Sequence, residues 1–148
     1  MYKEYTVHIY SNGDKFWYQN GKIHRDDGPA IECAKGSKFW YQNGKCHRDD
    51  GPAIEYADGS KRWYQNGKLH RADGPACEYS DGEKYWYQNG EFHRADGPAV
   101  ECLDGTKYWY IHGKKYTEEE FLQLQKPDCS GKVVEIEGRK YKLVLQEK

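Results

Sequence analysis

The chain has 148 residues, of which 36% are hydrophobic and 16% aromatic, and its formal net charge is -1. This length suits one domain, the aromatic content argues against disorder, and the balanced charge makes nucleic acid and anionic membranes unlikely partners on electrostatic grounds. No segment approaches the roughly 20 apolar residues of a transmembrane helix. The first residues, MYKEYTVHIY, lack the apolar core of a signal peptide, so a cytoplasmic location is expected.

The chain opens with Tyr5, Val7 and Ile9, which alternate with other residues and predict the first strand of a sheet. Tandem units of 23 residues follow, because the Asn-Gly steps at Asn20, Asn43, Asn66 and Asn89 share that spacing and degenerate to His112-Gly113. Three further features keep the same period: a tryptophan followed by tyrosine, the motif HRxDGPA, and a second turn ending in glycine. The tryptophans are Trp17, Trp40, Trp63, Trp86 and Trp109.

Asn-Gly and Asp-Gly steps between extended segments favour two-residue hairpins of type I′. The Asn43-Gly44 turn predicts that Trp40 lies opposite His47. The turn at Lys35-Gly36, interpreted in the same way, sets Trp40 opposite Ile31 and Phe39 opposite Glu32, and it predicts an ion pair of Glu32 with Arg48. The proline of HRxDGPA interrupts the ladder, so two kinked strands or three short strands per unit both remain open.

This register predicts a sheet with two different faces. One face carries the tryptophan, histidine, lysine and glutamine of each unit, and the other carries tyrosine, alanine, arginine, glutamate and a variable residue. The variable residues change while the scaffold stays constant, which makes them candidates for specificity. They occupy two slots: Phe16, Phe39, Arg62, Tyr85 and Tyr108, and Ile23, Cys46, Leu69, Phe92 and Lys115.

The C-terminal segment departs from the repeat. Thr117 and Glu120 form a capping-box pattern that predicts a helix of about two turns burying Phe121 and Leu122, with Leu124 as a further candidate, and ending at residues 126–128. Residues 133–136, a Glu-Gly turn and residues 141–145 predict a final hairpin. The expected architecture is therefore an all-β repeat array over residues 1–114, with a helix-and-hairpin cap over residues 115–148 that hides one open end.

The cysteines are odd in number and contain no C-x-x-C pair. Cys33 and Cys102 occupy one repeat position, which tyrosine fills in the two units between them, so thiol chemistry is not required there. We interpret the cysteines as reduced, half-buried packing residues. The full set is Cys33, Cys46, Cys77, Cys102 and Cys129.

The segment DGSKRWYQNGKLHRADG resembles the MORN repeat family, which shares the 23-residue period, the hairpin, the aromatic strand and both turns. The resemblance covers roughly residues 12–114. It departs where arginine follows histidine, where DGPA replaces a second glycine region, and where the segment before the Asn-Gly turn is shorter. MORN arrays are mostly scaffolds for protein partners, with lipid binding proposed for some, and HRxDGPA proteins resemble ones often encoded by bacteriophages and large DNA viruses. The resemblance implies an interaction role without a reaction.

Catalytic and metal sites are not expected from the repeat. Equivalent histidines in successive units lie two or three strands apart, which is about 10–14 Å, whereas metal ligands lie about 2 Å from one ion. The aspartate before each Gly-Pro is typical of a turn-forming residue, and the serines of the units have no base partner. We therefore predict no catalytic residue, no metal ligand and no cofactor, with the histidines packed on tryptophan and bonded to a turn.

The candidate binding residues fall into two groups. A face of tryptophan and histidine could stack planar rings, although packing against the cap or another chain is the simpler interpretation. The variable slots add three residues around the middle of the array. The two groups are Trp40, His47, Trp63, His70, Trp86 and His93, and Arg62, Tyr85 and Phe92.

Three functions remain open at this stage. The first is a non-catalytic interaction module that binds a host protein or assembles into a homo-oligomer, since open sheet edges invite partners. The second is a phage or viral anti-defence protein that sequesters a nucleotide-like small molecule. The third is a hydrolase that uses one His and Asp pair within a single repeat.

Overall fold

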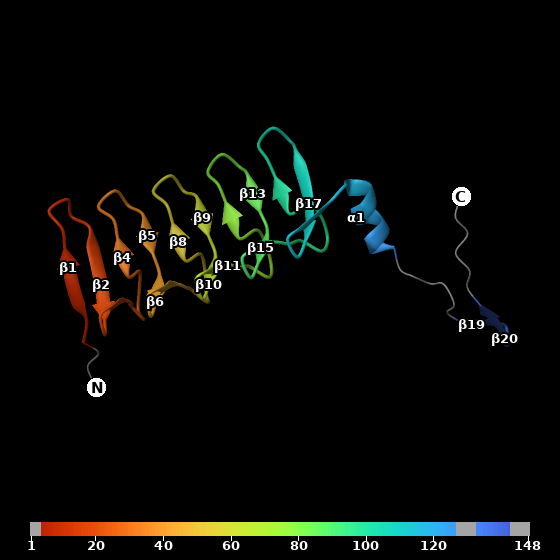
Figure 1. The fold of residues 1–148 in the computed structure, drawn as a ribbon, viewed down its shortest axis with the longest axis horizontal. Coiled ribbons are helices and arrows are strands. Elements are labelled where there is room, and N and C mark those ends of the chain that lie inside the picture. The colour runs from red at the N-terminus through yellow and green to blue at the C-terminus, as the bar shows by residue number, and fades with distance from the viewer. Residues whose placement is uncertain (1–3, 127–132, 143–148) are drawn as a thin grey trace. The chain divides into compact units, whose positions relative to one another are not determined.

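The computed structural model describes residues 4–126 and 133–142, and the chain divides into two compact units, Met1–Tyr116 and Thr117–Lys148. The first unit is a row of antiparallel hairpins, as predicted (Figure 1). Its strands are β1 (Thr6–Ile9), β2 (Lys15–Gln19), β3 (Lys22–Ile23), β4 (Ile31–Glu32), β5 (Lys38–Phe39), β6 (Tyr41–Gln42), β7 (Lys45–Cys46), β8 (Ile54–Glu55), β9 (Lys61–Arg62), β10 (Tyr64–Gln65), β11 (Lys68–Leu69), β12 (Cys77–Glu78), β13 (Lys84–Tyr85), β14 (Tyr87–Gln88), β15 (Glu91–Phe92), β16 (Val100–Glu101), β17 (Lys107–Ile111) and β18 (Lys114–Tyr116).

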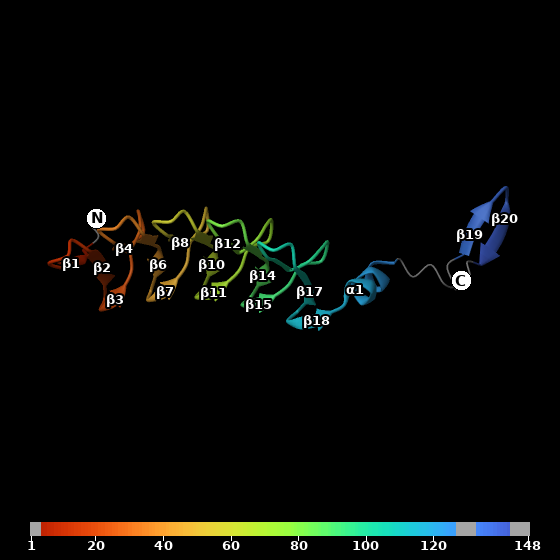
Figure 2. The ribbon, with the colours of Figure 1, turned by 90° about the horizontal axis from the view of Figure 1, so that it is seen from above.

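Twelve of these strands form one sheet in the order β1-β2-β4-β5-β8-β9-β12-β13-β16-β17-β18, with β3 beside β2. The hairpins β6–β7, β10–β11 and β14–β15 form a second row alongside this sheet (Figure 2). Neither of the two predictions, two kinked strands or three short strands per unit, describes this arrangement. In each middle unit the aromatic strand is itself divided into two short strands, one in each row.

The division occurs at the tryptophan. The Trp40 N–H donates to the Ala53 carbonyl in the main sheet at 2.8 Å, whereas its carbonyl accepts from the His47 N–H in the hairpin row at 3.0 Å. Trp63 and Trp86 make the equivalent pair of bonds. Each tryptophan of the middle units is thus the residue at which the strand passes from one row to the other.

The two turn types differ, and this corrects the predicted register. At Asn43-Gly44 both residues have positive φ, at 52° and 79°, as a type I′ turn requires. At the second turn only Gly36 has positive φ, and the Cys33 N–H bonds to the Ser37 carbonyl, so the loop has three residues rather than two. A glycine bulge of this kind shifts the pairing by one residue.

The shifted register changes the cross-strand neighbours. Ile31 lies opposite Phe39 and Glu32 lies opposite Lys38, so the predicted pairing of Trp40 with Ile31 is wrong. The register predicted across the Asn-Gly turn is confirmed, because Tyr41 lies opposite Cys46 and the His47 N–H bonds the Trp40 carbonyl. In the first variable slot, Phe39 therefore lies opposite Ile31 and Ile54 of the neighbouring strands.

The core of the array is thin. No large side chain in the described residues is fully buried, and the residues with no exposed surface are the alanines of the DGPA motifs, Ala30, Ala53, Ala76 and Ala99. In the second unit, Ala53, Ile54 and Cys46 form a buried cluster with half-buried aromatic rings around it. The low hydrophobic fraction of the chain is consistent with this thin packing.

The C-terminal unit contains the predicted helix, α1 (Glu118–Gln125), with both hydrogen bonds of the capping box between Thr117 and Glu120. Phe121 is buried, but Leu122 and Leu124 are 55% and 58% exposed, so their predicted burial is wrong. The helix ends at Gln125, and Pro127 and Asp128 lie outside the described residues.

The hairpin of β19 (Val133–Ile136) and β20 (Arg139–Lys142) begins its second strand earlier than predicted, and residues 143–145 lie outside the described part. The predicted role of this segment as a cap stays a prediction. No helix in the described residues is both long and apolar enough to cross a membrane.

Candidate functional site

Each HRxDGPA motif builds a cluster around its arginine. The Arg48 guanidinium lies over the Trp40 ring at 4.1 Å from the ring centroid, and its Nε donates to Asp50 at 2.9 Å. Its Nη1 donates to the Pro52 carbonyl and to Glu55, at 3.2 and 3.1 Å. Arg25, Arg71 and Arg94 repeat these contacts on their own tryptophans, 4.0 to 4.3 Å from the rings.

This cluster overturns the predicted Arg48–Glu32 ion pair, because Arg48 bonds Glu55 and Glu32 bonds Arg25, each at 3.1 Å. The hydrogen bond from Arg48 also holds the pKa of the Asp50 carboxyl below its usual value, and the charge of the guanidinium adds to the effect. The arginines therefore lie with the tryptophans rather than with the tyrosines, contrary to the predicted division of the faces.

The glycine of each motif lies in close contact with the guanidinium of its arginine. A Cβ on Gly74 would lie 3.0 Å from Arg71 Cζ and 3.1 Å from its Nε, and Gly28, Gly51 and Gly97 face their arginines at 3.1 Å. These glycines do not have the positive φ of the turn glycines. The guanidinium is thus packed between a tryptophan ring and a glycine, which no larger residue allows without displacement.

The histidines are bonded through both ring nitrogens in the first two units. His47 Nδ1 accepts from the N–H of Asn66 in the turn of the next unit at 3.0 Å, so the neutral ring carries its proton on Nε2, which faces Asp49 at 3.2 Å. His24 is placed in the same way, with Asp26 at 3.1 Å. The predicted bond between histidine and turn is confirmed. Its partner is the following unit, so the bond also links neighbouring repeats.

The later units lack this second partner, because Ala72 and Ala95 stand where the first units have aspartate. His70 and His93 keep the turn bond through Nδ1, at 3.2 and 3.1 Å. Burial, together with the neighbouring ring of His112 at 4.3 Å, lowers the pKa of His93.

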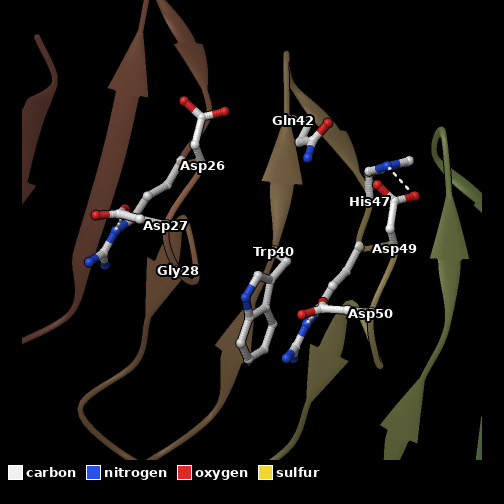
Figure 3. Close-up of a pocket in the computed structure, with 10 residues that line it drawn as sticks. Asp26, Asp27, Gly28, Trp40, Gln42, His47, Asp49 and Asp50 are labelled. Carbon is white, nitrogen blue, oxygen red and sulfur yellow. Dashed lines mark hydrogen bonds and ion pairs between the residues drawn. The ribbon is translucent and has the colours of Figure 1, made fainter. Parts of the chain in front are cut away.

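Three equivalent clefts of about 480 to 500 Å³ lie between successive HRxDGPA segments. In the first of them, Trp40 lies between Asp27 of one unit and Asp50 of the next, with Gln42 and His47 beside it (Figure 3). Two arginines line each cleft, and the number of aspartates falls along the chain from four to three to two. The first cleft has Asp26, Asp27, Asp49 and Asp50. The second has Asp49, Asp50 and Asp73, and the third has Asp73 and Asp96.

The other side of the strands carries two groups of aromatic contacts with Arg62 between them. Phe39 packs on Tyr56 at 6.0 Å, and beyond Arg62 the second group runs through Tyr79 and Tyr85 at 5.1 Å to Phe92 at 6.2 Å. All of these residues are half-buried. We name this surface the tyrosine face, and it consists of Phe39, Tyr41, Tyr56, Arg62, Tyr64, Tyr79, Tyr85, Tyr87, Phe92 and Tyr110.

Arg62 separates these two groups and differs from the other arginines of the array. Its guanidinium lies 5.1 and 5.5 Å from the rings of Tyr56 and Tyr79 and makes a 3.4 Å contact with the Tyr79 hydroxyl. Its Nε is buried without a hydrogen-bond partner among the described residues. Its cross-strand neighbours are the buried Ile54 and Cys77, so no carboxylate there reaches it.

The cysteines that the structure describes are unpaired, and Cys129 lies outside the described residues. Burial raises the pKa of Cys46 to about 12 and that of Cys77 to about 11, with Arg62 opposing the shift at Cys77. Cys33 and Cys102 are half-buried. Buried thiols of raised pKa are packing residues rather than nucleophiles.

The predicted binding residues therefore separate into two places. Trp40, Trp63 and Trp86 lie in the clefts with His47, His70 and His93, and Arg62, Tyr85 and Phe92 lie on the tyrosine face. The predicted binding residues did not include the arginines of the four HRxDGPA motifs, Arg25, Arg48, Arg71 and Arg94. The constant arginine and Gly-Pro of these motifs were a signal in the sequence that could have identified them. No group of three or more metal-ligating side chains gathers within residues 4–126 and 133–142.

Neither a model of a known protein family nor a curated protein sequence matches this chain. The repeated antiparallel hairpin sheet is compatible with a MORN-like repeat.

Proposed function

We propose that the chain is a non-catalytic binding module whose tyrosine face binds an acidic segment of a protein partner. The observation that carries this proposal is Arg62, a half-buried cation whose Nε has no hydrogen-bond partner in the described structure. A buried donor without a partner costs about 1–3 kcal/mol, and more when it is charged. A carboxylate from a partner would satisfy this donor in a bidentate pair.

The composition of the surroundings supports a protein partner. Tyrosine, phenylalanine and arginine are the residues enriched in the cores of protein interfaces, where large rings bury area at a low cost in conformational entropy. The tyrosine face supplies these types on one surface, with Arg62 as its cation. Its residues are half-buried in the chain alone, so each retains surface that a partner can cover.

A second copy of the same face is a poor occupant. A two-fold axis near the middle of the face would place two Arg62 guanidinium groups against each other without an intervening carboxylate. Like charges opposed in an interface are unfavourable. The proposal therefore names a different protein that presents aspartate or glutamate among apolar residues.

The test is selection of short random peptides displayed on a surface, followed by affinity measurements on the enriched sequences. We expect enriched peptides to contain Asp or Glu beside apolar residues, and Arg62→Met to weaken their binding by about tenfold or more. Lys61→Met is the matched control, because it removes the same charge from the adjacent exposed residue on the opposite side of the strand. Equal losses in both variants would show that only net charge matters and would contradict the proposal.

A small-molecule binder is the second candidate function, and the three clefts of about 480 to 500 Å³ favour it, since ligand pockets have volumes in this range. Aspartates equal or outnumber arginines around each cleft, which supports a cationic ligand better than the nucleotide-like signal of a phage or viral sponge. Native mass spectrometry of the protein from its natural source separates the two candidates. A retained mass of a few hundred daltons would favour the small molecule.

The hydrolase alternative has less support. A His–Asp pair exists in each of the first two units, but the second ring nitrogen already accepts a backbone N–H. In a catalytic triad that nitrogen faces the nucleophile instead. The interaction role also agrees with what the MORN resemblance implies for this chain.

A further inference from the structure

Strand β1 is the first edge of the twelve-stranded sheet and, among the described strands, pairs with β2 alone. The direction of its hydrogen bonds follows from its neighbours. The Tyr10 N–H donates to the Asp14 carbonyl, whereas Trp17, which lies opposite Val7, makes its backbone bonds with Ala30 and His24 on its other side. Bonding alternates along an antiparallel strand, so the backbone N–H and C=O groups of Val7 and Ile9 point away from β2.

Within the described residues, β1 lacks the charges, prolines and bulges that usually protect a sheet edge. The sequence of β1 is TVHI, without charge or proline, and its four residues pair with β2 in an uninterrupted register. All four residues are exposed, and Val7 and Ile9 have 43% and 69% of their surface accessible. Unpaired backbone groups and exposed apolar side chains thus occur at the same two residues.

The opposite edge of the sheet differs in this respect. Strand β18 carries Lys114 and Lys115, and charged lysine side chains on an edge strand discourage pairing with another chain. A contact of β1 with β18 of another copy would also be head-to-tail and would propagate into an open filament. A contact of β1 with itself is closed by a two-fold axis.

We propose that β1 pairs antiparallel with β1 of a second copy, with Val7 on the two-fold axis. In this register Ile9 of each copy lies opposite Tyr5 of the other, and the outward backbone groups of Val7 and Ile9 are all bonded. The two sheets become one continuous sheet, and the side chains of Val7 and Ile9 lie together on the face that carries Trp17. This dimer does not depend on the partner proposed for the tyrosine face.

Sedimentation equilibrium over a range of concentrations, with Val7→Pro and Val7→Thr as a matched pair of variants, tests the proposal. The wild type should approach twice the 17.4 kDa mass of the chain. Val7→Pro removes an outward N–H that the single chain does not use, so it should weaken dimerisation by about tenfold or more while the thermal unfolding of the monomer is unchanged. Val7→Thr keeps the N–H and should retain the dimer.

Amide hydrogen exchange gives a second readout. The amides of Val7 and Ile9 should exchange slowly in the dimer and rapidly on dilution, whereas the His8 amide, which bonds β2, should be protected in both states. A wild-type mass of 17.4 kDa at every concentration up to about 1 mM would overturn the proposal. A dimer that Val7→Pro leaves intact, or a mass that grows without limit, would overturn it as well.

Discussion

Replacement of Gly74 by alanine tests whether the packing of the arginine clusters stabilises the array. The added Cβ would lie 3.0 Å from Arg71 Cζ, so the guanidinium must move by a few tenths of an ångström. Because the Trp63 ring lies on its other side, at 4.0 Å, the guanidinium must slide sideways off the centre of the ring, which also stretches its 2.8 Å bond to Glu78. The backbone gives no reason for strain, because Gly74 does not have a positive φ.

The sign of the effect depends on two opposed terms. Loss of the cation–π contact costs about 0.5–1 kcal/mol, and weakening of the partly exposed Arg71–Glu78 pair costs up to about 1 kcal/mol. Alanine also restricts the unfolded chain, which stabilises the folded state by about 0.4–1 kcal/mol. We expect Gly74→Ala to lower the free energy of unfolding by about 0.5 kcal/mol, or the melting temperature by about 2 °C.

Urea unfolding of a double-mutant cycle with Arg71→Ala provides the assay. Once the guanidinium is absent, the same Gly74→Ala change should be neutral or stabilising, so the two substitutions should be strongly non-additive. Gly59→Ala supplies the contrast, because its φ of 91° makes alanine costly although nothing lies near its Cβ. Stabilisation by Gly74→Ala alone, or additivity with Arg71→Ala, would refute the reasoning.

Three further predictions concern titration, thiols and turns. The hydrogen bond from Arg71, followed by the charge of that arginine, lowers the pKa of Asp73 in the folded chain. The stability that this carboxylate contributes is therefore present above the ordinary carboxyl pKa and is lost as pH falls through the lowered pKa. Asp73→Asn should reduce this dependence in urea unfolding measured at a series of pH values from neutral into the acid range. In a Cys129→Ser background at pH 8, Cys46 and Cys77 should react with a thiol reagent far more slowly than the half-buried Cys33 and Cys102. All four should react fully in urea. Fast labelling of Cys46 and Cys77 in the folded protein would contradict their burial. Asn66→Ala should lower the free energy of unfolding by about 1 kcal/mol because Asn66 has a φ of 52°, and Asn66→Gly should recover most of it in the same thermal melts.

The two turn types show how far local sequence reasoning reaches. Asn followed by Gly specifies positive φ at two successive residues, and the register beside Asn43 follows from it. Lys35-Gly36 and Asp58-Gly59 look similar in sequence, but only the glycine has positive φ, and the loop takes one more residue. One residue of register exchanges the faces of a strand, so this difference altered the predicted surroundings of Glu32 and Phe39.

The candidate site was predictable in part. The grouping of the tryptophans with the histidines, and of Arg62 with Phe92, follows from the alternation of side chains along a strand. The place of Arg48 does not follow, because the chain leaves the sheet after His47: the Arg48 N–H bonds the Tyr64 carbonyl of the next unit and its side chain returns over Trp40. The recurring HRxDGPA motif marks where the bend lies, but side chains in a bend do not alternate as they do along a strand, so the direction of Arg48 could not be predicted.

The sequence alone determined the repeat, its period, the hairpins, the helix capped by Thr117 and the thin core, because these depend on local turn chemistry and on side chains that recur at constant spacing. Only the tertiary structure decided which groups are satisfied and which are not. Arg48 and Arg62 are the same residue type in one array, but Arg48 lies in a bend and Arg62 lies in strand β9. The first meets Asp50 and Glu55 across a bend, and the second meets Ile54 and Cys77 across a sheet. Those partners come from segments that only folding brings together.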